Sequence, residues 1–481
     1  MPEPKKRIIV DGIDFRQLFM FPLIFRAVPG AMQPPRLLIG LFMVLILITF
    51  GRAWDGVSTP AVHPGGLERG EMTVDEAAEA QRVYRSVLQT YASHRLSGEG
   101  PTQHFTAREV LRDMEKNYRQ QRDESLGAEQ LQRLDRAYLD ALSRIDQVRP
   151  KGVFEATSSY AIGSFHRVVR GVLTLQPMEA ARGFTDAVVV MPVLLWRNHT
   201  WFTVIYGIVF VLVMSVGGGA LSRMAACEIA GRQRLRVREA MEFSLVRWPR
   251  FFLAPLLPLV LAGGLALVVL VMGLLMTLPA LDIVGGLLYV FALVLGFIIA
   301  FLLLVYAAGF ILIVPAMATE NCDGADALQR AYAYVISKPL HLLGYAAVSL
   351  VALALGYFVV SLFAVTTMNV TAGLYGTLTT NSAMSAAGGF SMFDLSQPET
   401  GEIHSWHSAI SGGFIHLWQT LVVSLVWGYA VSLLFSSATC VYLLMRRASD
   451  GQDIEEIWRP GLVPGTLAPM PPAVVERVTN E

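Results

Sequence analysis

Six long apolar segments, each nearly free of charge, constrain the fold of this chain more than any other feature. A helix needs about 20 mostly apolar residues to cross the hydrocarbon core of a bilayer. Hydrophobic residues make up 54% of the chain and charged residues only 16%, against about 25% charged residues in soluble proteins. The predicted spans are Leu37–Phe50, Trp201–Leu221, Phe251–Leu278, Ile283–Pro315, Leu342–Val365 and Leu417–Met445. The sequence therefore predicts an all-α polytopic membrane protein with about six transmembrane helices.

The charge balance and the cysteine count narrow the classes of partner. Lys and Arg total 38, as do Asp and Glu, so no net positive charge favours nucleic acid as a partner. Three cysteines in the whole chain do not support a disulfide framework. We expect membrane lipids as partners, with another membrane or envelope protein as a further candidate.

Basic residues are concentrated on one side of the predicted spans. Residues 1–36 contain six Lys and Arg, the connector 222–250 contains seven, and the loop 367–415 contains none. Because cytoplasmic loops carry the excess of Lys and Arg, both termini are predicted to be cytoplasmic, in a cell inner membrane. The segment 53–199 then lies outside the cytoplasm. Its own charges do not contradict this, because long translocated segments do not follow the rule.

The first span has a competing interpretation as a removable signal peptide. A long segment precedes its apolar run, and no small-x-small cleavage pattern follows before Trp54 and Asp55. We therefore expect 37–52 to be an uncleaved transmembrane anchor, with an amphipathic helix before it at Asp14–Ala31.

The segment 53–199 has the pattern of an extracytoplasmic helical domain. Thr73 with Glu76, and Thr106 with Glu109, form capping-box patterns that each open an apolar-periodic run. A third run places apolar residues three or four positions apart at Leu131, Leu134, Tyr138, Ala141, Ile145 and Val148. A fourth helix is expected over Val153–Leu175, either packed into the bundle or lying along the membrane surface. Ala187–Trp196 is apolar but short, and we expect it to be interfacial.

The five-helix membrane domain 200–447 contains a weak internal repeat. Met224 precedes Gly231, and Met317 precedes Gly324, by the same seven positions. Acidic-Ala pairs then open an amphipathic stretch in each connector, at Glu239-Ala240 and at Asp326-Ala327. Such duplication predicts two related units, each with a span, a connector helix and a returning span. The tail 448–481 is rich in proline and is predicted to be a flexible cytoplasmic end.

These connectors carry a resemblance to a known family. The Gly-Gly-x-Leu-Ser-Arg-Met-Ala start, the Glu-Ala connector and the Asp-Ala-Leu-x-Arg-Ala-Tyr connector resemble a family of uncharacterised bacterial polytopic membrane proteins. They are also distantly similar to the membrane domains attached to some glycerophosphodiesterases. The likeness covers about residues 200–365, and no phosphodiesterase catalytic domain accompanies it here. The resemblance therefore implies a membrane fold without implying that activity.

Small residues recur every four positions in three of the spans, a spacing that predicts close helix packing. The sets are Gly296 and Ala300, Ala352 and Gly356, and Gly428, Ser432 and Ser436. Ordinary packing inside the bundle is the expected role, and a helix-dimer interface is the alternative.

A search of the sequence for chemistry assigns no catalytic, cofactor-binding or metal-binding residues. The interiors of the predicted spans lack Asp, Glu, Lys, Arg and His, and Asp282, His341 and His416 lie only at span ends. Because ionisable groups at membrane depth mark coupled transport and catalysis, their absence argues against a proton-coupled transporter. His404 and His407 are spaced for zinc only if a third ligand converges, so aromatic-flanked interfacial histidines are the preferred interpretation.

Two functional hypotheses remain from the sequence. The first is a non-enzymatic membrane protein, a scaffold or accessory subunit of an envelope or membrane complex. The second is a permease or lipid-handling protein built on the two repeated helical units. A polar inner cavity would favour the second hypothesis, and a solid bundle with a patterned outer surface would favour the first.

Overall fold

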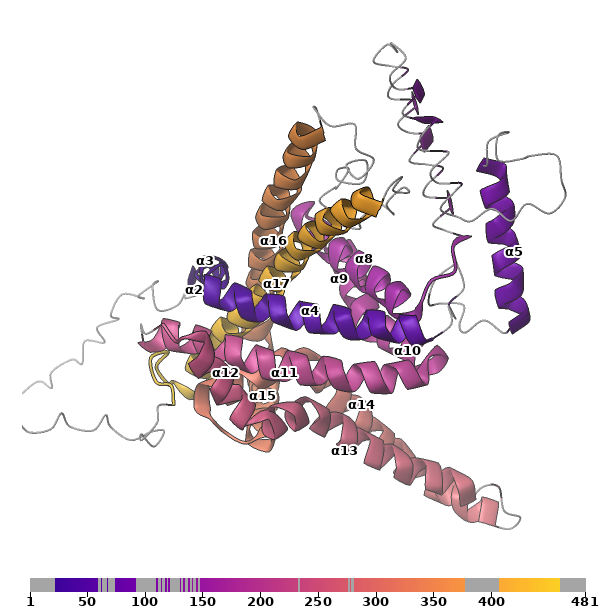
Figure 1. Ribbon diagram of the computed structural model, residues 1–481. Coiled ribbons are helices and arrows are strands. Elements are labelled where there is room, and N and C mark those ends of the chain that lie inside the picture. The colour runs from indigo at the N-terminus through magenta and orange to yellow at the C-terminus, as the bar shows by residue number, and fades with distance from the viewer. Residues whose placement is uncertain are drawn as a thin grey trace, which may run out of the picture. The chain divides into compact units, whose positions relative to one another are not determined.

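The computed structural model describes residues 22–58, 74–91, 149–231, 234–275, 281–376 and 406–458, with single positions between 62 and 148 and at 277. Within these residues the protein is helical, and its only extended feature is an isolated bridge between Val62 and Lys151. Six of the described helices are long and apolar enough to cross a membrane. They are α4 (Pro34–Val57), α11 (Thr200–Gly231), α13 (Trp248–Leu275), α14 (Leu281–Glu320), α16 (Pro339–Gly376) and α17 (Trp406–Asp450). The predicted all-α multi-pass fold is confirmed (Figure 1).

Most of these helices are longer than the apolar runs that predicted them. The largest extension is in α17, which has 45 residues, and α14 has 40 residues. At 1.5 Å per residue, α14 is about 60 Å long, roughly twice the thickness of a hydrocarbon core. Pro255 and Pro258, where the sequence predicts a kink or an entry turn, lie inside the continuous helix α13. The added turns bring charged residues into the helices.

The chain divides into two compact units, whose boundaries fall inside α4, α11, α16 and α17. The first unit comprises Met1–Ile39, Val211–Leu353 and Val431–Glu481, and the second comprises Gly40–Phe210 and Ala354–Ala430. Each of the four divided helices therefore contributes one part to each unit.

In the first unit, two short helices occupy the connectors between spans. These are α12 (Val237–Val246) and α15 (Gly324–Ser337), and α15 packs against both α13 and α14. Positions that correspond in the sequence repeat are buried alike: Met224 and Met317 are buried, and Ala240 and Ala327 are fully buried. Both connectors therefore turn the same residues toward the protein interior.

The segment before the first span differs from the expected single amphipathic helix. Residues 14–21 lie outside the described residues, and the rest forms α2 (Pro22–Phe25) and α3 (Ala27–Ala31), with a break at Arg26. Ile24 and Ala31 are fully buried. The Ser432 hydroxyl of α17 donates to the Ala31 carbonyl at 3.2 Å. This part of the segment packs against α17 and does not lie freely on a lipid surface.

In the second unit, α8 (Val153–Leu173) is the predicted fourth helix, and it packs against α16 and α17. The core of this contact contains Val169 of α8, Tyr357, Val365 and Met368 of α16, and Val426 of α17. After α8 the chain forms α9 (Pro177–Thr185), a π-helical turn at Asp186–Val190 and α10 (Met191–Asn198). The apolar run 187–196 is thus short helix and is not among the candidate spans.

Part of the predicted outer apolar stripe is also described. Helix α5 (Val74–Tyr91) begins directly after Thr73, where the capping-box pattern places a helix start. Its Leu88 is buried with Val110 and Ile145, with Tyr84 and Met114 beside them. Ala141 is buried, Leu134 is half-buried and Arg133 is exposed, as the stripe predicts. Thr73, Thr106 and Glu109 lie outside the described residues.

Small residues contact other helices in two of the three predicted sets. Ala352 and Gly356 are buried, and Gly428 lies against the backbone of Gly40 and Leu41, which leaves no space for a Cβ. Gly296 and Ala300 are exposed, and a Cβ at Gly296 would meet no described atom. The expectation of bundle packing is therefore wrong for this last set, because that face of α14 has no neighbour among the described residues.

Candidate functional site

Three buried arginines in the first unit form the most unusual chemical feature of the described residues. Arg36 of α4, Arg223 of α11 and Arg446 of α17 are only 3%, 6% and 2% exposed. Arginine is almost never fully buried unless it is paired. Each arginine lies within one turn of the apolar run that predicts its span, where the lengthened helix carries it into the protein. These three arginines therefore need partners within the protein.

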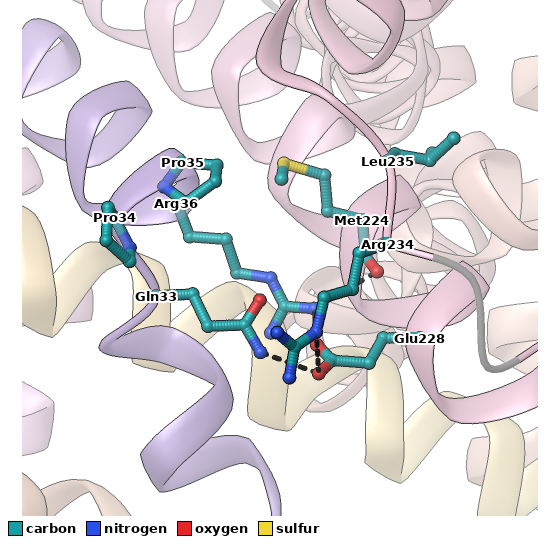
Figure 2. Close-up of a pocket in the computed structure, with 8 residues that line it drawn as sticks. All are labelled: Gln33, Pro34, Pro35, Arg36, Met224, Glu228, Arg234 and Leu235. Atoms are coloured by element: carbon teal, nitrogen blue, oxygen red, sulfur yellow. Dashed lines mark hydrogen bonds and ion pairs between the residues drawn. The ribbon is translucent and has the colours of Figure 1, made fainter.

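Arg36 forms an ion pair with Glu228 of α11 (Figure 2). Its Nη2 lies 2.5 Å from Glu228 Oε2 and also donates to the Met224 carbonyl at 3.1 Å. The Gln33 amide donates to the second carboxylate oxygen of Glu228 at 2.6 Å. Because Met224 and Glu228 are four residues apart on α11, one helical face presents both acceptors to Arg36. This pair fastens the start of α4 to the end of α11.

A second charged group, the Glu320 cluster, consists of Glu320, Arg330, Tyr442 and Arg446. Glu320, at the end of α14, lies 2.7 Å from Arg330 Nη1 and 3.6 Å from Arg446 Nη1, and it accepts a hydrogen bond from Tyr442. Burial lowers the pKa of Arg330, but the adjacent Glu320 carboxylate together with Tyr442, Tyr334 and Cys322 outweighs burial, so the pKa of Arg330 is raised. One carboxylate thus joins α14, α15 and α17.

Arg446 and Arg223 also bind the segment that follows α17. Arg446 donates to the carbonyls of Asp453 at 2.9 Å and Glu456 at 2.5 Å. Arg223 donates to the Ala318 carbonyl at 3.0 Å and to the Trp458 carbonyl at 2.8 Å. Residues 451–458, which the sequence assigns to a flexible tail, are therefore hydrogen-bonded to the helix ends, and 459–481 lie outside the described residues.

Aromatic rings complete the contacts of this region. The Arg223 guanidinium lies 4.9 Å from the centre of the Phe243 ring, and that of Arg247 lies 4.4 Å from the same ring. Arg247 also donates to the Asn321 side chain at 2.6 Å. Burial, and then the nearby Arg250, lower the pKa of Arg247. Asn321 itself adopts a positive φ of 55° directly after α14, a conformation typical of a helix C-terminus.

A cavity of about 310 Å³ lies beside the Arg36–Glu228 pair. We call it the α2–α17 cavity, and it is lined by Leu23, Arg26, Ala27, Arg36, Ala225, Glu228, Ile229, Ser436 and Glu455. A smaller hollow of about 110 Å³, drawn in Figure 2, shares Arg36 and Glu228 with it and is lined further by Gln33, Pro34, Pro35, Met224, Arg234 and Leu235. The larger volume falls in the range of small-molecule sites, about 300–1,000 Å³.

Several polar groups of the α2–α17 cavity lack partners. The Ser436 hydroxyl is 1% exposed and forms no hydrogen bond, and Arg36 Nε is also buried without an acceptor. The side chains of Arg26 and Glu455 are exposed to solvent, and neither forms an ion pair or a hydrogen bond with another described side chain. Buried polar groups are almost always satisfied, which makes the Ser436 hydroxyl and Arg36 Nε exceptions among the described residues. A polar ligand or water therefore has donors and acceptors available in this cavity.

The second unit contains one buried polar contact of comparable interest. His166 Nε2 of α8 lies 2.8 Å from the Tyr357 hydroxyl of α16, and both residues are buried. Phe165 and Trp427 pack around this pair, with ring centres 4.9 Å (edge-on) and 5.6 Å (tilted) from that of Tyr357. The contact holds α8 against the spans and fills the space between them.

The residues that the sequence search considered for chemistry do not come together. His404 lies outside the described residues, as does the His407 side chain. Asp282 and His341 are exposed, and His416 is half-buried in α17. No group of three His, Cys, Asp or Glu able to hold a metal occurs among the residues that the structure describes. No disulfide joins the cysteines Cys227, Cys322 and Cys440.

Sequence reasoning missed the arginine sites because it used basic residues only as topology signals. Arg36, Arg223 and Arg446 each adjoin an apolar run, which the positive-inside rule explains without any burial. Glu228 and Glu320 are the signals that were available. Each is the first acidic residue after a long apolar run, within the last turns of the helix that contains the run.

No family model, curated protein or solved structure matches this chain.

Proposed function

We propose that this protein is a non-enzymatic scaffold or accessory subunit of a membrane or envelope complex. In this proposal it resides in a bacterial inner membrane with both termini in the cytoplasm. The arginine-rich helix ends of the first unit support the orientation, because basic residues favour the cytoplasmic side. The proposal also includes a relationship to the family of uncharacterised bacterial polytopic membrane proteins that residues 200–365 resemble.

The observation that carries the proposal is the firm attachment of α8 to the membrane helices. The Asp55 carboxylate at the end of α4 accepts hydrogen bonds from the N–H groups of Phe154 and Glu155, both at 2.9 Å. Further along, α8 is held by the His166–Tyr357 contact and by apolar packing on α16 and α17. A solid core of this kind suits a platform that presents helices outside the membrane.

Helix α5 offers the surface that a partner would meet. One side of α5 is buried through Ala80 and Leu88, while Val83 on another side is exposed. Asp75, Glu76 and Glu79 are also exposed on this helix. An exposed helix that combines acidic and apolar residues fits a protein partner better than the interior of a bilayer.

Site-specific photo-crosslinking in intact membranes tests the proposal. A photoreactive residue at Val83 should give adducts with another protein. The matched control is Leu253, which is exposed on the candidate span α13 and should give lipid adducts only. Val83→Asp should abolish recovery of the same partner while leaving the amount of protein unchanged. Lipid adducts alone at both positions would contradict a scaffold role.

The α2–α17 cavity is the observation that favours the second candidate function, lipid handling. Sealed vesicles that contain the full-length protein test this second function. If the protein does not move lipids, the rate of lipid exchange between leaflets should be no higher than in empty vesicles. The vesicles with protein should also keep an imposed pH gradient as long as empty vesicles do, because the interiors of the six predicted apolar runs contain no Asp, Glu, Lys, Arg or His. Faster lipid exchange would favour the lipid-handling function.

A further inference from the structure

The α2–α17 cavity lies at the level where the apolar part of the spans begins. Arg36 directly precedes the apolar run that starts at Leu37, and Ala225 follows closely after the run that ends at Leu221. Lipid headgroups occupy this level of a bilayer, next to the hydrocarbon core. A ligand of the cavity is therefore in the right place to be a membrane lipid.

The charges around the cavity are balanced and only half paired. Arg26 and Arg36 contribute positive charge, and Glu228 and Glu455 contribute negative charge. Arg36 and Glu228 neutralise each other, whereas Arg26 and Glu455 have no described partner. The cavity thus leaves one cation and one anion available, together with the unpartnered Ser436 hydroxyl. This set matches a ligand that carries one negative and one positive group.

The remaining lining residues favour a primary ammonium over a quaternary one. Leu23, Ala27, Ala225 and Ile229 are aliphatic, and no aromatic ring is among the residues that line the cavity. Quaternary ammonium groups are characteristically bound by aromatic cages. A carboxylate such as that of Glu455 instead suits an ammonium that donates hydrogen bonds.

We propose that the α2–α17 cavity binds the headgroup of phosphatidylethanolamine. Arg26 and the Ser436 hydroxyl bind its phosphate, with Arg36 beside them, and Glu455 binds its ammonium. The aliphatic residues contact the glycerol and the first carbons of the acyl chains. The bound lipid gives the buried Ser436 hydroxyl a partner and replaces water at the exposed side chains of Arg26 and Glu455.

Native mass spectrometry of the full-length protein in mild detergent tests this assignment. Phosphatidylethanolamine should bind at least about tenfold more tightly than phosphatidylcholine or phosphatidylglycerol, since a lost charge-assisted contact is worth about a factor of ten in affinity. Arg26→Gln should weaken phosphatidylethanolamine binding about tenfold. Glu455→Gln should remove the preference over phosphatidylglycerol. The matched controls, Arg238→Gln and Glu242→Gln, replace exposed residues of the nearby helix α12 and should change nothing.

Three results would overturn the proposal. The first is equal binding of the three lipids, and the second is an equal effect of the control variants. The third is displacement by free phosphoethanolamine at the concentration at which the lipid itself binds, because that would assign the cavity to a soluble zwitterion. Ser436→Ala provides an independent check, since this small change should weaken lipid binding without lowering the thermal stability of the lipid-free protein.

Discussion

The two units of this protein hold their helices together by different means. In the first unit, helix ends are joined by ion pairs and by arginines that donate to carbonyls, around Arg36, Arg223 and Arg446. In the second unit, α8 packs on α16 and α17 through apolar and aromatic side chains and the buried His166–Tyr357 contact. The Arg167–Asp186 ion pair of this unit is partly exposed to solvent. Removing one partner of a buried ion pair costs more than removing one neutral hydrogen bond. The first unit should therefore be the more sensitive to single polar substitutions.

The largest expected effect comes from Glu320→Ala in the first unit. The change leaves Arg446, which is 2% exposed, without its carboxylate. Loss of one partner of a buried ion pair costs about 3–5 kcal/mol. We expect a large drop in thermal stability, measured by tryptophan fluorescence of the purified protein in detergent. Glu242→Ala, at an exposed position of α12, is the control and should change little. Equal stabilities of the two variants would show that the Glu320 cluster does not hold the helix ends.

Tyr357→Phe tests the second unit and should have a smaller effect. The ring and its packing remain, but His166 Nε2 loses its hydroxyl partner. Loss of one neutral hydrogen bond costs about 0.5–1.5 kcal/mol. The same unfolding measurement should place this variant between Glu320→Ala and the wild type. A loss as large as that of Glu320→Ala would contradict the contrast between the units.

Asp55→Ala removes the carboxylate that caps α8. Loss of an N-terminal cap costs about 0.5–2 kcal/mol, typically about 1 kcal/mol. Protease digestion should therefore begin earlier near α8, with little change in the remainder of the protein. Asp55→Asn keeps only one of the two oxygens that accept from the N–H groups of Phe154 and Glu155, so it should fall between the wild type and Asp55→Ala. Equal digestion of both variants and the wild type would show that the cap contributes nothing.

Labelling of Cys322 tests how closely the helix ends of the first unit pack, and it needs no change in the sequence. Burial, and then the nearby Glu320, raise the pKa of this thiol to about 12. The thiolate is the reactive form, so alkylation by a maleimide should be slow at neutral pH. Its rate should rise about tenfold per pH unit until the pH approaches that pKa. Burial is the largest cause of the raised pKa of Cys322. Glu320→Ala should therefore speed alkylation chiefly by exposing this thiol to solvent. Rapid labelling of the wild type at neutral pH would show that the Cys322 thiol beside the Glu320 cluster is not buried.

The fold was largely predictable from the sequence, whereas the candidate site was not. Apolar length alone identifies all six candidate spans, and apolar periodicity identifies α8 and the stripe of buried residues that includes Leu88, Ala141 and Ile145. The α2–α17 cavity draws residues from α2, α3 and the break between them, from α4, α11 and α17, and from the chain after α17. No local pattern relates Arg26 to Glu455 across that distance in sequence.

The sequence by itself determined which segments are membrane helices and where their basic flanks lie, because length and polarity act on each segment separately. Only the tertiary structure decided that Arg36, Arg223 and Arg446 are buried, since burial depends on which helix ends meet. It also decided that Gly428 packs on Gly40 while Gly296 faces no described neighbour. A small residue permits close approach, but the partner helix comes from long-range packing. For the same reason His166, unremarkable in the sequence, meets Tyr357 only once α8 lies against α16.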